Sequence, residues 1–197
     1  MNAFLISFFI LFNSSITKIE NPSNNINENS IERDVLKYMN EVRTNPKKFK
    51  QEVLIPFLKI NKGYSSKYVK SLKKDLDQLT PLPPLKNHEV LKEFAHHHAK
   101  STGKVGKVGH RSVLMKSYQA RSNKLLKTFS NVGENIHYGS DNAKLIVLEL
   151  LIDDGISGVG HRKNILNKDY VFAGISLQPH KKFGKNCVIE FGGELVQ

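Results

Sequence analysis

The chain has 197 residues and a mass of 22.3 kDa, a length that suits one domain with short appendages. Its formal net charge of +12 favours anionic partners. However, the lysine pairs 47–48, 73–74 and 181–182 lie far apart in the sequence, and no nucleic-acid-binding motif accompanies them. We therefore expect a basic, solvated surface, with an anionic membrane surface as a candidate partner and no nucleic acid.

Common catalytic motifs are missing from the sequence. It contains no G-x-S-x-G nucleophile elbow, no Walker loop, no H-E-x-x-H helix and no dinucleotide fingerprint. These absences argue against a conventional hydrolase, kinase or dehydrogenase.

The first residues have the composition of a secretion signal. Residues 3–12 form an apolar run of ten, followed by Asn13, Ser14 and Ser15, and no lysine or arginine precedes the run. Such a run fits the hydrophobic part of a signal peptide and is too short to span a bilayer. We predict a signal peptide over residues 1–17 and a secreted protein, with an N-terminal anchor as the alternative.

An asparagine-rich stretch, residues 18–30, is poor in large apolar side chains and predicts a linker. The domain is then expected over residues 31–197. From Ile31 onward, apolar residues recur three or four positions apart, which predicts a helix capped by Asn29 or Ser30.

Further helices are predicted after the first one. Pro46 ends the first helix and suits the first position of a second one. Residues 61–80 are lysine-rich and weakly periodic, which predicts a short helix or an insertion. The next helix is predicted to be capped by Asn87, to pack His98 with its apolar face and to be closed by Gly103.

The C-terminal half predicts one helix and two strands. Residues 141–155 are mostly apolar and predict a helix, whereas residues 171–177 and 188–191 predict adjacent strands. Cys187 is the only cysteine, so no intrachain disulfide can form, and we expect it to be buried as a small apolar side chain. Helices that flank a small sheet without strict βαβ alternation predict an α/β fold, the α-β-α sandwich.

Two residues stand out as candidates for a polar site. His161 lies between a glycine and a basic pair, on a predicted loop where its imidazole can project. It either binds a ligand or fixes the loop through a backbone carbonyl. Glu134, between Val132 and Ile136, is predicted to be partly buried and therefore needs a histidine, a metal or backbone donors as a partner.

Two more residues extend this predicted site. Glu149 interrupts the apolar stripe of the helix over residues 141–155, and lies either at a cavity rim or extended to solvent. We favour the rim, because the loop that leaves this helix leads to His161. His110 follows the glycine-lysine loop over residues 103–109. Two histidines and two carboxylates match the ligand chemistry of Zn²⁺, although spacing alone does not show that they converge.

Short motifs occur in a specific order along the chain. They include Gly133-Glu134-Asn135-Ile136, Leu151-Ile152-Asp153-Asp154-Gly155, Gly160-His161-Arg162-Lys163-Asn164-Ile165-Leu166 and Cys187-Val188-Ile189-Glu190-Phe191. In this order the sequence resembles the CAP superfamily, the SCP-domain fold of cysteine-rich secretory, antigen 5 and pathogenesis-related 1 proteins. The resemblance is to its cysteine-poor, bacterial-type branch and covers about residues 31–194.

The resemblance implies a cavity that is lined by two histidines and two acidic residues and can hold a divalent metal. The cavity residues carried over are His110, Glu134, Glu149 and His161. The two histidines and Glu134 are the predicted metal ligands, with Zn²⁺ as the candidate ion. Asp153 or Asp154 could replace Glu149, because the tryptophan-tyrosine context usual at this position is absent.

The resemblance also implies a class of function. Family members are secreted and have been linked to sterol or lipid binding, defence, venoms and fertilisation, without an established general catalytic activity. We therefore expect a secreted, monomeric, non-enzymatic module that binds a ligand, such as a sterol or lipid, or a protein partner. The alternative is a metal-assisted protease or esterase with His110 and His161 as ligands and Glu134 as general base. A purely structural secreted module is the third hypothesis.

Overall fold

The computed structural model describes residues 22–111, 113 and 117–197, and only the backbone of residues 22–29. The predicted signal peptide over residues 1–17 therefore lies outside the described residues. The elements are α1 (Pro22–Thr44), α2 (Pro46–Phe49), the π-helical turn η1 (Lys50–Leu54), α3 (Ile55–Ile60), α4 (Ser66–Gln78), β1 (Lys86–Asn87), α5 (Glu89–Val105), α6 (Tyr118–Leu125), β2 (Val132–Tyr138), α7 (Ala143–Ile152), α8 (Gly160–Ile165), β3 (Phe172–His180) and β4 (Gly184–Gly192).

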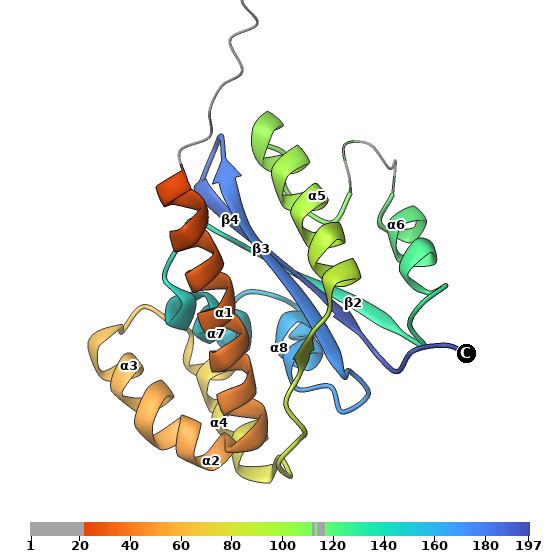
Figure 1. The fold of residues 1–197 in the computed structure, drawn as a ribbon. Coiled ribbons are helices and arrows are strands. Elements are labelled where there is room, and N and C mark those ends of the chain that lie inside the picture. Colours follow the sequence, from red (N-terminus) through yellow and green to blue (C-terminus); the bar gives the residue numbers. More distant parts are fainter. Residues whose placement is uncertain (1–21, 112, 114–116) are drawn as a thin grey trace, which may run out of the picture.

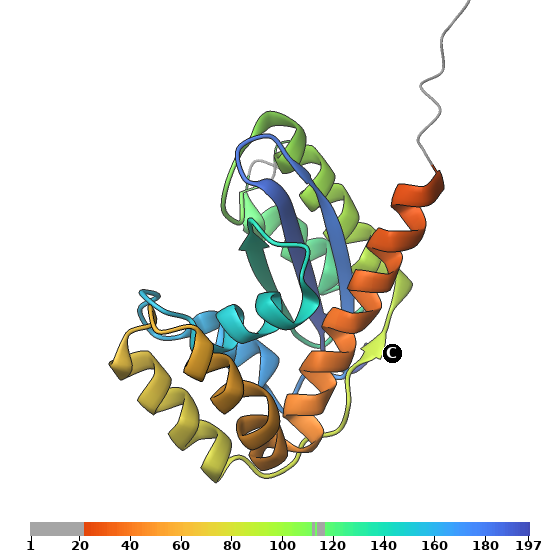
Figure 2. The ribbon, with the colours of Figure 1, turned by 90° about the vertical axis from the view of Figure 1, so that its left-hand side faces the viewer.

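One sheet organises the fold, with the strand order β1-β3-β4-β2 (Figure 1). The short strand β1 is parallel to β3, whereas β3 with β4 and β4 with β2 pair antiparallel. In this register Glu134 of β2 lies opposite Glu190 of β4. Helices cover both faces of the sheet: α1 and α7 lie on one side and α5 on the other (Figure 2). The predicted α-β-α sandwich is confirmed.

The two faces of the sheet have separate cores, because successive side chains of a strand point to opposite faces. Ile175 and Ile189 pack in the large cluster with residues of α1 and α7. Ile136 and Val188 instead pack against Ala95 and Ala99 of α5. Within the described ranges, no helix is long and apolar enough to cross a bilayer.

The first helix is longer than predicted. It begins at Pro22, so residues 22–30 of the expected linker are helical, and a cap at Asn29 or Ser30 is wrong. Proline suits the first turn of a helix, and no glycine or proline follows before Pro46. The helix therefore meets no strong breaker in the asparagine-rich stretch, even though neither helix propensity nor large apolar side chains support it there.

The ends of α5 also differ from the prediction. The N-cap is His88, because Asn87 pairs in β1. The helix continues past Gly103 and ends at Gly106, whose φ of +72° is favourable for glycine. Gly103 has a different role: a Cβ at this position would lie 2.1 Å from the carbonyl oxygen of Pro179. The glycine permits close packing of α5 on the sheet and does not end the helix.

The remaining predictions differ mainly in their boundaries. The residues after Pro46 form a continuous helical segment as far as Ile60, and α4 is the predicted short helix in the lysine-rich stretch. Both predicted strands are longer, with only residues 181–183 between them. Cys187 is fully buried as expected, and burial raises the pKa of its thiol, which argues against a nucleophile.

Candidate functional site

The strand β2 directs its polar residues to both faces of the sheet. Glu134 and Ile136 point toward α5, whereas Asn135 and His137 point toward α7 and α8. All four residues are buried. The motif that contains Glu134 therefore contributes to two separate polar clusters, one on each side of the sheet.

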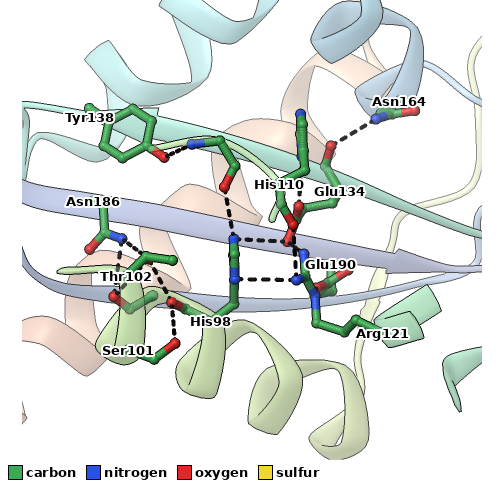
Figure 3. A network of polar contacts seen from close by, with 12 residues as sticks. His98, Ser101, Thr102, His110, Arg121, Glu134, Tyr138, Asn164, Asn186 and Glu190 are labelled. Atoms are coloured by element: carbon green, nitrogen blue, oxygen red, sulfur yellow. Dashed lines mark hydrogen bonds and ion pairs between the residues drawn. The ribbon is translucent and has the colours of Figure 1, made fainter. Parts of the chain in front are cut away.

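Glu134 is the centre of the cluster on the α5 side (Figure 3). Its carboxylate is fully buried and both oxygens are engaged. Nδ1 of His110 lies 2.6 Å from Oε1, and Nη2 of Arg121 donates to Oε2. The prediction that this glutamate needs a partner is confirmed, and the partners are a histidine and an arginine.

Arg121, on α6, connects this cluster. Its Nε donates to Oε1 of Glu190 at 3.0 Å, and its Nη1 donates to Nδ1 of His98 and to the carbonyl of His110, both at 3.2 Å. The Arg121 side chain is almost fully buried. A guanidinium presents five N–H donors in a planar fork, which suits a residue that binds two carboxyls and an imidazole at once.

The pKa values of the two glutamates are shifted in opposite directions. Burial alone would raise the pKa of Glu134, but the hydrogen bond with His110 and the charge of Arg121 outweigh it, and the pKa lies below its usual value. Burial raises the pKa of Glu190 well above its usual value, and the charge of Glu134 adds to this effect. Within the described part of the chain, Oε2 of Glu190 is buried without a hydrogen-bond partner, which agrees with the direction of this pKa shift.

His98 completes the cluster in a neutral form. Burial, together with the nearby Arg121 charge, lowers its pKa to about 4, although Glu134 acts in the opposite direction. Its Nε2 donates to the carbonyl of Gly109 at 3.2 Å, and its Nδ1 accepts from Arg121. The lowered pKa of His98 therefore favours its neutral form, and Arg121 is the buried cation that pairs with Glu134.

His161 has a different partner on the other side of the sheet. It lies in the first turn of α8, not on a loop as predicted, and its Nδ1 is 2.7 Å from Oδ1 of Asp153. Oδ2 of Asp153 accepts from the backbone N–H of His161 at 2.9 Å. The carbonyl of His161 accepts from Asn135, which ties α8 to the edge strand β2. Because Asp153 engages Nδ1, Nε2 is the nitrogen left for an outside group, and 21% of the side chain is exposed.

Asp153 has an unusual backbone conformation. It caps α7 with a φ of +55°, a left-handed conformation that aspartate tolerates better than most residues. This conformation lets one buried carboxylate receive both the imidazole and the backbone N–H of His161. Asp153, an alternative for the second acid in the sequence analysis, is therefore the acid that contacts a predicted histidine.

Glu149 forms a third polar group. One of its oxygens lies 2.5 Å from Nε2 of His137, and the other accepts from the hydroxyl of Tyr64 at 3.1 Å. The hydrogen bond with His137 holds the pKa of Glu149 below its usual value. Its side chain is 37% exposed, which agrees with a position at a rim, but its contacts are with neither His110 nor His161.

The four predicted site residues are therefore distributed over three separate pairs. The structure brings His110 and Glu134 into contact, and it pairs His161 with Asp153 and Glu149 with His137. Among the described residues, no group of three or more His, Cys, Asp or Glu side chains is arranged to hold a metal ion. Arg121 also places a cation directly on Glu134. The residues as arranged do not fit the Zn²⁺ site predicted from the sequence.

Several members of these clusters were not predicted as site residues. Arg121 has no motif around it, and its role follows only from its position on α6. Glu190 carried a usable signal, because a carboxylate within the apolar run of β4 must find a partner. Arg162, beside His161, is buried and donates to the carbonyls of Leu151 and Ile152, so it supports the fold.

Comparisons with known proteins identify one family. The family described as the cysteine-rich secretory protein family, or CAP, matches residues 36–191. A comparison with curated proteins gives no match.

Three solved bacterial structures show partial similarity. An extracellular protein with an SCP domain from Bacillus anthracis is 22% identical, with a TM-score of 0.46 over 57% of this chain and 35% of that one. An outer surface protein from Borrelia burgdorferi is 19% identical, with a TM-score of 0.48 over 64% and 89%. A cysteine-rich secretory protein from Staphylococcus aureus is 15% identical, with a TM-score of 0.43 over 65% and 39%. This chain thus spans about a third of the Bacillus chain's length.

Proposed function

Because this chain belongs to the cysteine-rich secretory protein (CAP) family, we propose that it is a secreted protein that acts by binding a ligand or partner and not by catalysis. One observation supports the second part of this proposal: the carboxylate of Glu134 is fully buried and both of its oxygens are engaged. A general base must reach the proton that it removes from water or substrate. Glu134 is held away from both by His110 and Arg121.

The buried cluster instead supports a rigid surface. It fixes His110 through Nδ1, while about half of the His110 side chain, 49%, is exposed. The ring of Tyr118 lies edge-on to His110 with 5.7 Å between ring centroids. Binding costs less conformational entropy when the contacting side chains are already held in place. A sterol, another lipid or a protein is the proposed ligand class, and the apolar run over residues 3–12 supports secretion.

A hydrolysis assay tests the non-enzymatic part. Fluorogenic ester and peptide substrates are incubated with the wild-type protein, with and without added Zn²⁺, and we expect no turnover above buffer. The matched variants are Glu134→Gln, and Glu93→Gln on the exposed face of α5. Turnover that disappears in Glu134→Gln and persists in Glu93→Gln would replace this proposal with the metal-assisted hydrolase.

Secretion has an independent test. The full chain is expressed in a secreting host, and the intact mass of the protein in the medium is measured. We expect a mass that corresponds to the loss of about the first 17 residues. Recovery of the full-length chain from the cell membrane alone would support the N-terminal anchor.

A further inference from the structure

Two stretches of the sequence contain basic residues but no acidic ones. Residues 94–133 contain eight lysines and arginines and no aspartate or glutamate, and residues 170–189 contain three lysines and again no acid. The first stretch includes the end of α5, and the second includes the turn between β3 and β4. Lysines that are dispersed in the sequence gather where these two segments meet.

The contact between these segments is closely defined. The backbone N–H of Lys181 donates to the carbonyl of Gly103 at 2.9 Å, and Nε2 of His180 donates to the carbonyl of Lys107 at 3.0 Å. Nδ1 of His180 accepts from the backbone N–H groups of Lys182 and Phe183. The end of α5 and the β3–β4 turn therefore form one surface.

We call this surface the basic end of the molecule. It consists of exposed lysines and exposed apolar side chains: Lys100, Lys104, Lys107, Lys181 and Lys182, with Val105, Val108 and Phe183. Across the described ranges of the chain, none of these five lysines forms an ion pair with a carboxylate. Their positive charge is therefore not neutralised within the domain.

The apolar side chains at the basic end are exposed to solvent. Val105 is 54% exposed, Val108 50% and Phe183 39%. The ring of Phe183 is held beside Tyr138, with 5.3 Å between centroids, and Nζ of Lys182 lies 5.1 Å from its centroid. Phe183 is thus partly exposed next to a lysine, with its ring packed against Tyr138.

We propose that the basic end docks on an anionic phospholipid bilayer. This inference rests on the proposed binding function and names its partner and its surface. Lysines near an anionic leaflet gain electrostatic attraction, and apolar side chains between them gain from entering the boundary of the acyl chains. A soluble polyanion would satisfy the lysines but would leave Val105, Val108 and Phe183 in water, so the combination favours a bilayer.

The position of the chain's entry into the fold agrees with this orientation. Helix α1 begins at Pro22 at the same end of the molecule as the end of α5 and the β3–β4 turn (Figures 1 and 2).

The absence of tryptophan from the sequence allows a direct test of insertion. Val108→Trp places a single fluorophore at the basic end, and Ile60→Trp places one on α3, at a site that is 83% exposed and lies away from it. Phosphatidylserine-containing vesicles should shift the emission of the Val108→Trp protein to shorter wavelength and leave Ile60→Trp unchanged. Equal shifts, or none, would overturn the proposal.

Variants that remove lysines test the electrostatic part of the proposal quantitatively. The affinity for the same vesicles, measured by co-sedimentation, should fall by about 25-fold in Lys104→Gln/Lys182→Gln, because each lysine near the membrane surface contributes about fivefold. The matched control, Lys70→Gln/Lys74→Gln, removes the same charge from exposed positions on α4 at the opposite end. We expect it to change binding by less than about twofold, because distant charges are screened. Equal losses in both variants would show that net charge alone drives attachment.

The remaining comparison separates the bilayer from a soluble polyanion. Val105→Ser/Val108→Ser should weaken vesicle binding and leave elution from a heparin column unchanged. Loss of heparin binding with unchanged vesicle binding would contradict the proposal. If the protein does not bind phosphatidylserine-containing vesicles but binds neutral sterol-containing vesicles or a protein, this inference fails and the proposed function stands. Hydrolysis of substrates would instead contradict the proposed function.

Discussion

The two faces of the sheet bury different kinds of side chain. Toward α1 and α7, β3 and β4 direct mainly apolar residues, among them Ile175, Ile189 and Phe191, into one continuous core. Toward α5 and α6, the sheet directs Glu134 and Glu190, which meet Arg121 and His98. The apolar face gains free energy from removal of hydrocarbon from water. The polar face must instead recover the desolvation of its charges through pairing.

The acid-histidine cluster on the α5 face is held by contacts within the protein. On the α5 face, the carboxylate of Glu134 is paired with a guanidinium, and the raised pKa of Glu190 and the lowered pKa of His98 favour their neutral forms. Every charge therefore has a partner inside the protein. The same residue types that suggest a metal site in the sequence form a structural cluster when an arginine reaches them first.

The largest expected loss of stability comes from removing Arg121, the cation on the face of the sheet toward α5. Arg121→Leu leaves Glu134 buried without its positive partner, and breaking a buried pair on one side typically costs about 3–5 kcal/mol. Urea unfolding followed by circular dichroism should show a loss in this range. The double variant Arg121→Leu/Glu134→Gln should recover part of it. A loss below about 1 kcal/mol in the single variant would mean that the cluster is not held by this charge.

A substitution on the apolar face provides the comparison. Ile189→Ala removes a fully buried side chain from the large core and should reduce the free energy of unfolding by about 2–5 kcal/mol, with no rescue from a second polar change. The control is Ile60→Ala, at an exposed position, where we expect a change within about 0.5 kcal/mol. Equal effects at the two positions would contradict the assignment of the core.

Lowering the pH should reduce stability mainly through the polar face, where His98 is buried. The pKa of His98 falls from 6.5 to about 4 on folding, so its contribution to stability is present above pH 6.5 and is lost as the pH falls toward 4. The difference corresponds to a loss of about 3 kcal/mol over this range. Thermal unfolding from pH 7 to pH 4 measures it. His98→Gln, which keeps a donor for the Gly109 carbonyl, should flatten the dependence, and an unchanged slope would assign it to other groups.

Glu190 on the polar face should give a pH dependence of stability opposite to that of His98. Its pKa is raised on folding, so the folded state holds this proton more tightly, and the resulting stability is present below pH 4.5 and lost as the pH rises through the folded pKa. Glu190→Gln keeps a neutral donor of nearly the same shape. We expect Glu190→Gln to change the stability by less than about 1 kcal/mol at pH 4 and to lose less stability than the wild type as the pH rises from 4.5. Strong destabilisation by Glu190→Gln at pH 7 would show that Glu190 is ionised.

The smallest expected signal is that of zinc binding, because the predicted ligands lie in separate clusters. Calorimetric titration of the wild-type protein with Zn²⁺ should give no saturable heat at comparable concentrations of metal and protein. Heat that is saturable and that disappears in both His110→Ala and His161→Ala would restore the shared site. Heat that disappears in only one of these variants would place the metal on one face of the sheet.

The sequence alone predicted the architecture and the local burial of many residues. Periodic apolar positions identified most of the longer helices and the strands β3 and β4, but not α6, α8 or the edge strand β2. The isolated Cys187 and the helix position of His98 predicted their burial. Glu134 was recognised as a carboxylate that needs a partner. These features depend on neighbours within a few residues, which is the range over which helix and strand periodicity carries information.

Tertiary structure alone decided which polar groups meet. Arg121 reaches Glu134 because α6 lies over the face of β2 that Glu134 occupies, and His161 is bound by Asp153 because α7 ends in a left-handed turn. Likewise, the lysines at 104 and 182 become neighbours only because α5 packs on the β3–β4 turn. Charges and hydrogen bonds act through space over a few ångströms, and the sequence fixes those distances only through the complete fold.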